Sequence, residues 1–205
     1  FTPSALLANL VTSTTFSAYG DQNRLRDQGQ IIVQSSTVRD SLNFGINIDA
    51  APRGTAAIGS NPTPHPGAVK NTQEENTARL TTGVVVMNNV IAGNVAGGVR
   101  FSGDSANNPS AAVPYGRIIN NTIVGLNGGQ RGVGIDVNQN ASPTLLNNIL
   151  ADLATGVQID LSSQLAGTTI GATLYRGNGT NFNNGALGAG TFPIFLNAAD
   201  ALFVD

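Results

Sequence analysis

The side chains best suited to chemistry are three charged groups on strand-like stretches that each begin with glycine. Arg100, Asp136 and Asp160 lie in the stretches Gly-Val-Arg-Phe, Gly-Ile-Asp-Val and Gly-Val-Gln-Ile-Asp. If these stretches are neighbouring strands, side-chain alternation turns all three residues outward, with Arg100 beside Asp136 and Asp160 on the next strand. Such a group can contact an anionic glycan. Exposed opposite charges on neighbouring strands more often form cross-strand ion pairs that add little stability.

Other candidates for catalysis or metal binding are weaker. His65 stands between two prolines, and the chain has no second histidine and no cysteine to complete a metal site. Glu74 and Glu75 are interpreted as a solvated pair rather than a catalytic dyad. The glycine-rich stretch 128–132 lacks the Lys-Ser/Thr of a phosphate-binding loop, so it is predicted to be a turn.

A repeated pattern must position these residues. Between Arg117 and Leu161 the chain twice presents an apolar pair, two asparagines, a short apolar strand, a turn and a glycine-led strand. Asn120 and Asn147, the first asparagines of the two copies, are 27 residues apart. A repeat of this length indicates short strands that bury their apolar faces by stacking on one another.

Asparagine suits the bend between two such strands because it tolerates left-handed backbone angles better than other residues with a side chain. Amides at equivalent places in stacked strands can then hydrogen-bond along the stack. We predict an asparagine ladder made of Asn88, Asn89, Asn120, Asn121, Asn147 and Asn148. Three further coils are expected, at 29–49, 84–101 and 169–175, which makes five in all. In the first coil Ser35-Ser36 stands in place of the asparagine pair, and the fifth coil has lost the pair, so the ladder should weaken at both ends.

The predicted fold is all-β, a single-stranded right-handed parallel β-helix, or solenoid, because parallel crossovers are right-handed. The expected organisation is an N-terminal segment and possible cap at 1–28, coils at 29–175, loop insertions at 50–82 and 103–116, and an irregular C-terminal segment with short closing strands at 176–205. Both loops follow a glycine-led strand, so they should lie on one side of the molecule.

Composition supports this class of fold. The 205 residues include 25 glycines, no cysteine, no tryptophan and only 11% charged residues, as in a solenoid with a polar, uncharged surface. The net charge of −2 gives no electrostatic basis for binding nucleic acid or an anionic membrane. No apolar run approaches the roughly 20 residues of a membrane-spanning helix, so membrane insertion is not expected.

The Asn-Asn turns, the Gly-Ile-Asp-Val strand and the Ala-Leu-Phe-Val-Asp stretch at 201–205 resemble right-handed parallel β-helix repeats of the pectate-lyase-like superfamily. They are most similar to those of large secreted or surface-anchored bacterial proteins of unknown function. The resemblance covers roughly 29–175 and implies a fold and an extracellular or cell-surface location. Enzymes of that superfamily use clustered carboxylates, sometimes with Ca²⁺, and this chain shows neither closely spaced Asp pairs nor a dense Asp cluster.

Two function classes remain open. The first is a non-catalytic structural or adhesive module, extracellular, whose apolar C-terminal strands favour end-to-end self-association into a surface filament. The second is a polysaccharide lyase or glycoside hydrolase acting on an acidic glycan, with Arg100, Asp136 and Asp160 as the first contacts to examine. The thinly spread charges favour the first class. No cofactor is expected, although Ca²⁺ stays possible.

Overall fold

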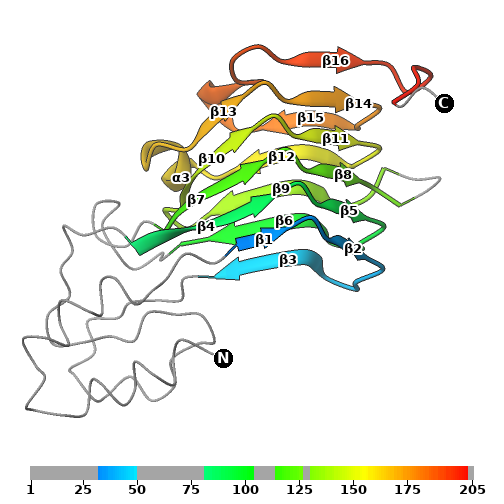
Figure 1. Cartoon of the computed structure of the whole chain (residues 1–205). Helices are drawn as coiled ribbons and strands as arrows, with labels where there is room; N and C mark the ends of the chain where they lie inside the picture. Colours follow the sequence, from blue (N-terminus) through cyan, green and yellow to red (C-terminus); the bar gives the residue numbers. More distant parts are fainter. Residues whose placement is uncertain (1–31, 50–80, 104–113, 127–129, 203–205) are drawn as a thin grey trace, which may run out of the picture.

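The computed structural model describes residues 32–49, 81–103, 114–126 and 130–202. These residues form mainly strands, with one short α-helix and one 3-10 helix. All strand pairs described are parallel, and they make three sheets, which we call A, B and C (Figure 1). The predicted all-β, parallel class is therefore confirmed.

The bounds of the elements are as follows. Sheet A contains β1 (Ile32–Gln34), β4 (Thr81–Met87), β7 (Pro114–Ile119), β10 (Ser142–Leu146) and β13 (Thr169–Gly171). Sheet B contains β2 (Thr37–Arg39), β5 (Val90–Ala92), β8 (Thr122–Val124), β11 (Ile149–Ala151), β14 (Leu174–Arg176) and β16 (Ile194–Leu196). Sheet C contains β3 (Phe44–Asp49), β6 (Gly97–Ser102), β9 (Val133–Asn138), β12 (Thr155–Ile159) and β15 (Thr180–Asn183). The helices are α3 (Leu161–Leu165) and the 3-10 helix η2 (Gly185–Leu187).

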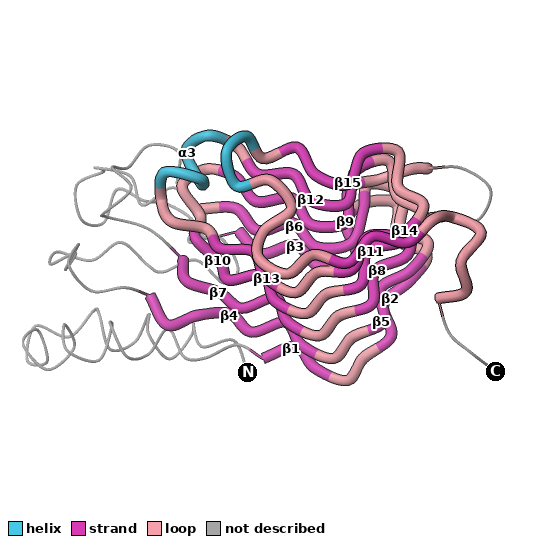
Figure 2. The backbone as a smooth tube through the Cα atoms, turned by 90° about the horizontal axis from the view of Figure 1, so that it is seen from above, coloured by secondary structure: helices cyan, strands magenta, loops and turns pink. Residues whose placement is uncertain are grey.

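Successive strands are distributed to the three sheets in rotation. Each set of three, such as β7, β8 and β9, places one strand in A, one in B and one in C, and we call such a set a repeat. Within each sheet the strands follow one another in chain order. Viewed from above, the strands of successive repeats lie over one another and α3 lies where the chain passes from sheet C to sheet A (Figure 2). A partial sixth repeat consists of Thr191, which bridges to Gly171 of β13, and of β16; among the described residues it has no strand in sheet C.

The interior is filled by apolar side chains at equivalent positions of successive strands. Sheet B supplies Ile91, Ile123, Leu150 and Tyr175, all at most 1% exposed. Sheets A and C supply Val86, Ile118, Leu145, Val99, Phe101, Ile135, Val137, Val157 and Ile159. Removing these stacked groups from water supplies the main driving force for folding.

The glycines that lead the sheet C strands make room for sheet B. A Cβ on Gly134 would lie 2.8 Å from Leu153 Cδ1, 3.1 Å from Leu150 Cδ2 and 2.5 Å from the carbonyl oxygen of Gly156. Any larger residue would therefore have to push the interior side chains aside.

Several predicted boundaries differ from the structure. Strand β4 begins at Thr81 and β7 at Pro114, so the ends predicted for the insertions 50–82 and 103–116 fall inside these strands. Residues 50–80 and 104–113 lie outside the described residues, as does the segment 1–28. The stretch predicted to be irregular contains β15, which extends sheet C although its sequence, Thr-Asn-Phe-Asn, has little apolar character. Of the short closing strands expected at 192–196 and 202–204, the first forms as β16, whereas Leu202 is not in a strand and 203–205 lie outside the described residues.

Candidate functional site

The outer face of sheet C carries a row of polar side chains. The paired positions are Asn47, Arg100, Asp136, Gln158 and Asn183, one from each strand. The residues on either side of Arg100 and Asp136 in their strands belong to the buried core, so alternation turns this row away from the interior. Ser102 and Asn138 pair in a second row two residues further along.

Arg100 and Asp136 are brought together, as the sequence predicted. Arg100 Nε lies 3.5 Å from Asp136 Oδ2, and the guanidinium carbon lies 5.8 Å from the ring centroid of Phe44. Arg100 Nε is buried and has no hydrogen-bond partner, so this contact is an ion pair without a good hydrogen bond. The Arg100 side chain is 42% exposed and that of Asp136 only 11% exposed.

Burial controls the ionisation of Asp136. Removal of this carboxyl from water raises its pKa above the usual value, while Arg100 and the amide of Asn138 act in the opposite direction and Asp160 adds repulsion. Asn138 Nδ2 donates to Asp136 Oδ2 over 3.1 Å. The two neighbours therefore compensate only part of the cost of holding a buried negative charge.

Asp160 has a different environment. It is the N-cap of α3, and its Oδ1 accepts hydrogen bonds from Ser163 N at 2.7 Å and Ser162 Oγ at 2.8 Å. Its Oδ2 accepts from Gln139 N at 2.9 Å. Burial acts to raise the pKa of Asp160, but these hydrogen bonds outweigh it and the pKa lies below the usual value. The structure thus gives Asp160 a capping role, and it acts on Asp136 only through its charge.

No metal site accompanies these residues. Across residues 32–49, 81–103, 114–126 and 130–202, no three His, Cys, Asp or Glu side chains gather as metal ligands would. The outer face of sheet C therefore offers, in its described part, a cation, a poorly solvated carboxyl and several amides. Such a set can hydrogen-bond to hydroxyl and carboxylate groups.

The six predicted ladder asparagines lie at the bend between sheets A and B, in two columns. Asn89, Asn121 and Asn148 point inward and are at most 1% exposed. Asn121 Oδ1 accepts from Asn89 Nδ2 at 3.0 Å, and Asn121 Nδ2 donates to Asn148 Oδ1 at 3.1 Å. The same oxygens accept the backbone N–H of the preceding repeat, so each amide joins two repeats.

The outer column consists of Asn88, Asn120 and Asn147, which have positive φ angles of 54°, 55° and 59°. Asn147 Nδ2 donates to Asn120 Oδ1 over 3.1 Å at the surface. Ser35 and Ala172, at the same bend in the first and fifth repeats, also have positive φ. The first residue of each pair therefore makes the bend and the second ties the repeats together.

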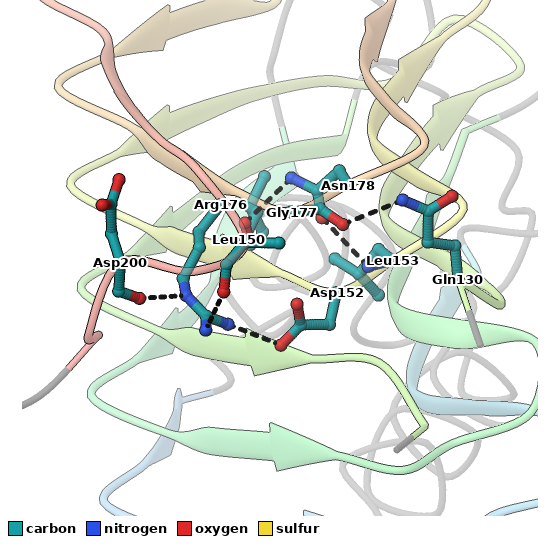
Figure 3. Close-up of polar contacts among 9 residues, drawn as sticks. Gln130, Leu150, Asp152, Leu153, Arg176, Gly177, Asn178 and Asp200 are labelled. Carbon is teal, nitrogen blue, oxygen red and sulfur yellow. Dashed lines mark hydrogen bonds and ion pairs between the residues drawn. The ribbon is translucent and has the colours of Figure 1, made fainter. Parts of the chain in front are cut away.

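The bend between sheets B and C contains a cluster of hydrogen-bonded polar residues that sequence reasoning missed. Arg176 donates from Nη1 to Asp152 Oδ2 at 2.8 Å, from Nε to the Asp200 carbonyl at 2.8 Å and from Nη2 to the Ala198 carbonyl at 2.6 Å (Figure 3). Asn178 beside it accepts from Leu153 N and donates to the Leu150 carbonyl. The available signal was the pair Gly177-Asn178, which matches Gly93-Asn94 at the same bend of the second repeat.

Comparison with known proteins supplies no function for this chain, so the geometry described above is the basis for assigning one. Within the described parts of the chain, no helix has both the length and the apolar character that crossing a bilayer requires. No family model, curated protein or solved structure matches the chain.

Proposed function

We propose that this chain is a structural module of an extracellular or cell-surface protein, folded as a single-stranded right-handed parallel β-helix of the pectate-lyase-like kind. The rotation of successive strands through three parallel sheets supports a single winding path. Right-handedness rests on the strong preference of parallel crossover connections for that hand.

The observation that carries a structural role is the buried asparagine column. Asn89, Asn121 and Asn148 connect the first four repeats through side-chain and backbone hydrogen bonds. At one end of the column Asn89 accepts from Ser36 N of the first repeat, and at the other Asn148 of the fourth repeat donates to the Ile118 carbonyl of the third. Buried polar groups that are fully bonded rigidify a fold and specify its register. Among the described residues, the buried asparagine amides thus serve to hold neighbouring repeats together.

The adhesive face in this proposal is the outer face of sheet C. Arg100 is partly exposed above the Phe44 ring, and Gln158 follows Asp136 on the next strand. An exposed guanidinium with the amide of Asn47 on one side, and the amide of Gln158 beyond Asp136 on the other, suits hydroxyl-rich, acidic polysaccharides, which it would contact without cleaving. Catalysis of lyase or hydrolase type would need a second ionisable group in contact with this pair, and Asp160 is already bonded to the α3 backbone.

The test combines binding and turnover on a panel of uronate polymers. We expect retention of the chain on at least one acidic polymer, without release of unsaturated products that absorb in the ultraviolet. Arg100→Ala should weaken retention about tenfold, in line with loss of a charge-assisted contact. Arg117, which is exposed on the outer face of sheet A, supplies the matched control Arg117→Ala, which should bind normally.

Product release that depends on Arg100 and Asp136 would establish the enzyme class instead. Equal loss of binding in the Arg100 and Arg117 variants would show a non-specific charge effect and remove the proposed adhesive face.

A further inference from the structure

We propose that one end of this molecule binds the opposite end of a second copy, so that sheet B continues from copy to copy. The inference rests on the β-helix proposed above and names its partner. In Figure 1, β16 lies at one end of the stack, and β1, β2 and β3 lie at the other. Among the described strands, β16 and β2 are the two edges of the same six-stranded sheet.

The interior is open at the β16 end. The inward positions of sheet B are Ile91, Ile123, Leu150, Tyr175 and Phe195 in chain order. The first four are at most 1% exposed, whereas Phe195 is 53% exposed. Its ring stacks on Tyr175 with centroids 5.5 Å apart, so one face is covered by the repeat below it and the other meets solvent.

Strand β16 itself carries no charged residue and no proline, although Pro193 stands directly before it. Natural edge strands discourage pairing with charged residues, proline or a bulge. The sequence of β16 is Ile-Phe-Leu, and Ile194 next to Phe195 is 52% exposed. An apolar edge with free backbone groups favours the addition of another parallel strand.

The opposite end offers a matching edge. Val38, the inward residue of β2, is only partly buried, unlike its equivalents in the middle repeats. A second copy placed with β2 next to β16 would pair parallel strands in the existing direction. That contact would set Val38 over the open face of Phe195 and continue the apolar column.

Charges at the two ends are complementary. Arg39 is 72% exposed, its Nε lies 3.7 Å from the similarly exposed carboxylate of Asp40, and it belongs to the same outward row of sheet B as Arg176 and Leu196. From one strand below Leu196, Arg176 binds the carbonyls of Ala198 and Asp200. Arg39 of the second copy would stand one strand above Leu196, on the other side of the same segment. There the exposed Asp200 provides a carboxylate, whose Oδ2 already accepts a hydrogen bond from Asn197 N at 2.6 Å.

A contact between unlike ends is heterologous, so repetition gives an open filament rather than a closed dimer. Sheet B contributes six strands per copy. At the usual strand spacing of about 4.8 Å, each copy would advance the filament by about 29 Å.

The experiment is sedimentation velocity of the 205-residue chain over a wide concentration range, with electron microscopy of the largest species. We expect mass to rise with concentration and filaments with an axial repeat of about 29 Å. Phe195→Lys places a charge in the open column and should weaken self-association at least about tenfold. Leu165→Lys is the matched control, because Leu165 is 74% exposed on α3 at the side of the stack and should leave association unchanged.

A second pair of variants does not disturb the interior. Arg39→Asp and Asp200→Arg should each weaken association, and the double exchange should restore it. A chain that stays monomeric at all concentrations, or equal association of the Phe195 and Leu165 variants, would overturn the proposal. So would failure of the double exchange to rescue. A monomer with an all-β spectrum and glycan binding would leave the proposed function intact, so the two ideas fail separately.

Discussion

Asn121 is the residue on which the connection between repeats depends most. Its amide accepts from Asn89 N and Nδ2 and donates to Asn148 Oδ1 and to the Val86 carbonyl. Asn121→Ala would leave several of these buried groups without partners. We expect it to lower the free energy of unfolding by about 2–4 kcal/mol, measured by chemical denaturation.

The neighbouring Asn120 provides the control. It is exposed, has a positive φ of 55° and makes one side-chain bond, to Asn147. Glycine accepts this backbone angle without strain, so Asn120→Gly should change stability by no more than about 0.5 kcal/mol. Equal losses of unfolding free energy in Asn121→Ala and Asn120→Gly would contradict the different roles of the inner and outer columns.

Asp136 should make stability depend on pH in the direction opposite to that of an ordinary salt-bridged carboxylate. Its folded pKa is raised above 3.8, chiefly by burial, so the folded state binds the proton more tightly than the unfolded state. This contribution favours folding below the unfolded pKa and is lost as pH rises through the folded pKa. Asp136→Asn should therefore stabilise the protein at neutral pH.

The gain in unfolding free energy from Asp136→Asn should disappear at a pH well below 3.8, where Asp136 of the wild type is protonated in both the folded and the unfolded state. Denaturation curves at the two pH values, with carboxyl-carbon NMR of the wild type, would measure it. Stabilisation of the same size at both pH values would show that the effect is not ionisation.

Residue chemistry was only partly predictable from the sequence. The Asn-Asn pairs identified the bend, because few residues accept left-handed angles. Which asparagine of a pair faces inward depends on how the bend changes the alternation of side chains along the strand. The structure shows that Asn121 is buried and Asn120 exposed. The expected strand register predicted that Arg100 and Asp136 lie side by side. The burial of Asp136 could not be predicted, because its neighbours in the row are polar.

At the scale of elements, the glycine near the start of β3, β6, β9 and β12 sets how closely sheets B and C approach. Gly134→Ala would place a methyl group 2.5 Å from the Gly156 carbonyl oxygen and 2.8 Å from Leu153 Cδ1. We expect a loss of about 2–3 kcal/mol in unfolding free energy, as for overpacked cores. Gly188→Ala isolates backbone strain, since Gly188 has φ +55° and no atom within 4 Å; it should cost about 1 kcal/mol. A smaller loss for Gly134→Ala than for Gly188→Ala would show that the sheets separate easily.

Helix α3 depends on its cap. Asp160→Ala removes acceptors for Ser163 N, Ser162 Oγ and Gln139 N, and should cost about 1–2 kcal/mol. Because the pKa of Asp160 is lowered below 3.8, its stabilisation is present above the unfolded pKa and is lost as pH falls through the folded pKa. The difference between wild type and Asp160→Ala should therefore shrink in acid. Asp160→Asn, which keeps an oxygen acceptor, should lose less at neutral pH.

The sequence predicted strands better than the segments between them. Apolar pairs and alternation identified the strands of the middle repeats, but the five-residue α3 has no helical periodicity to detect. Strand β15 escaped prediction because three of its four residues are polar and it stands between glycine-rich stretches, and it forms by pairing with β12. Tertiary pairing overrides local propensity in such a stretch.

At the scale of the whole molecule, burial predicts a gradient of local stability along the stack. Inward side chains of the middle repeats, such as Ile123 and Leu150, are at most 1% exposed, whereas Phe195 in the last repeat is 53% exposed. When each repeat contacts only its neighbours, opening begins at an end. Backbone amides of β8 and β11 should therefore exchange hydrogen most slowly, and those of β16 faster.

Arg176 limits this opening at the β16 end, because it binds Asp152 and the carbonyls of Ala198 and Asp200 at once (Figure 3). Arg176→Met keeps an apolar stem and removes all three bonds. Hydrogen bonds from a charged group are each worth about 1.5–3 kcal/mol, so protection of the β16 amides should fall at least about tenfold. Protection in β5 and β8 should not change, since these strands lie two or more repeats away.

The measurement is hydrogen exchange by mass spectrometry at a concentration where the chain is monomeric, with Arg117→Met as the control for loss of an exposed arginine. If Arg176→Met lowered protection equally in β8 and β16, the repeats would unfold as one cooperative unit. If it left β16 unchanged, pairing with β14 alone would hold the last repeat, and the Arg176 cluster would have no part in its stability.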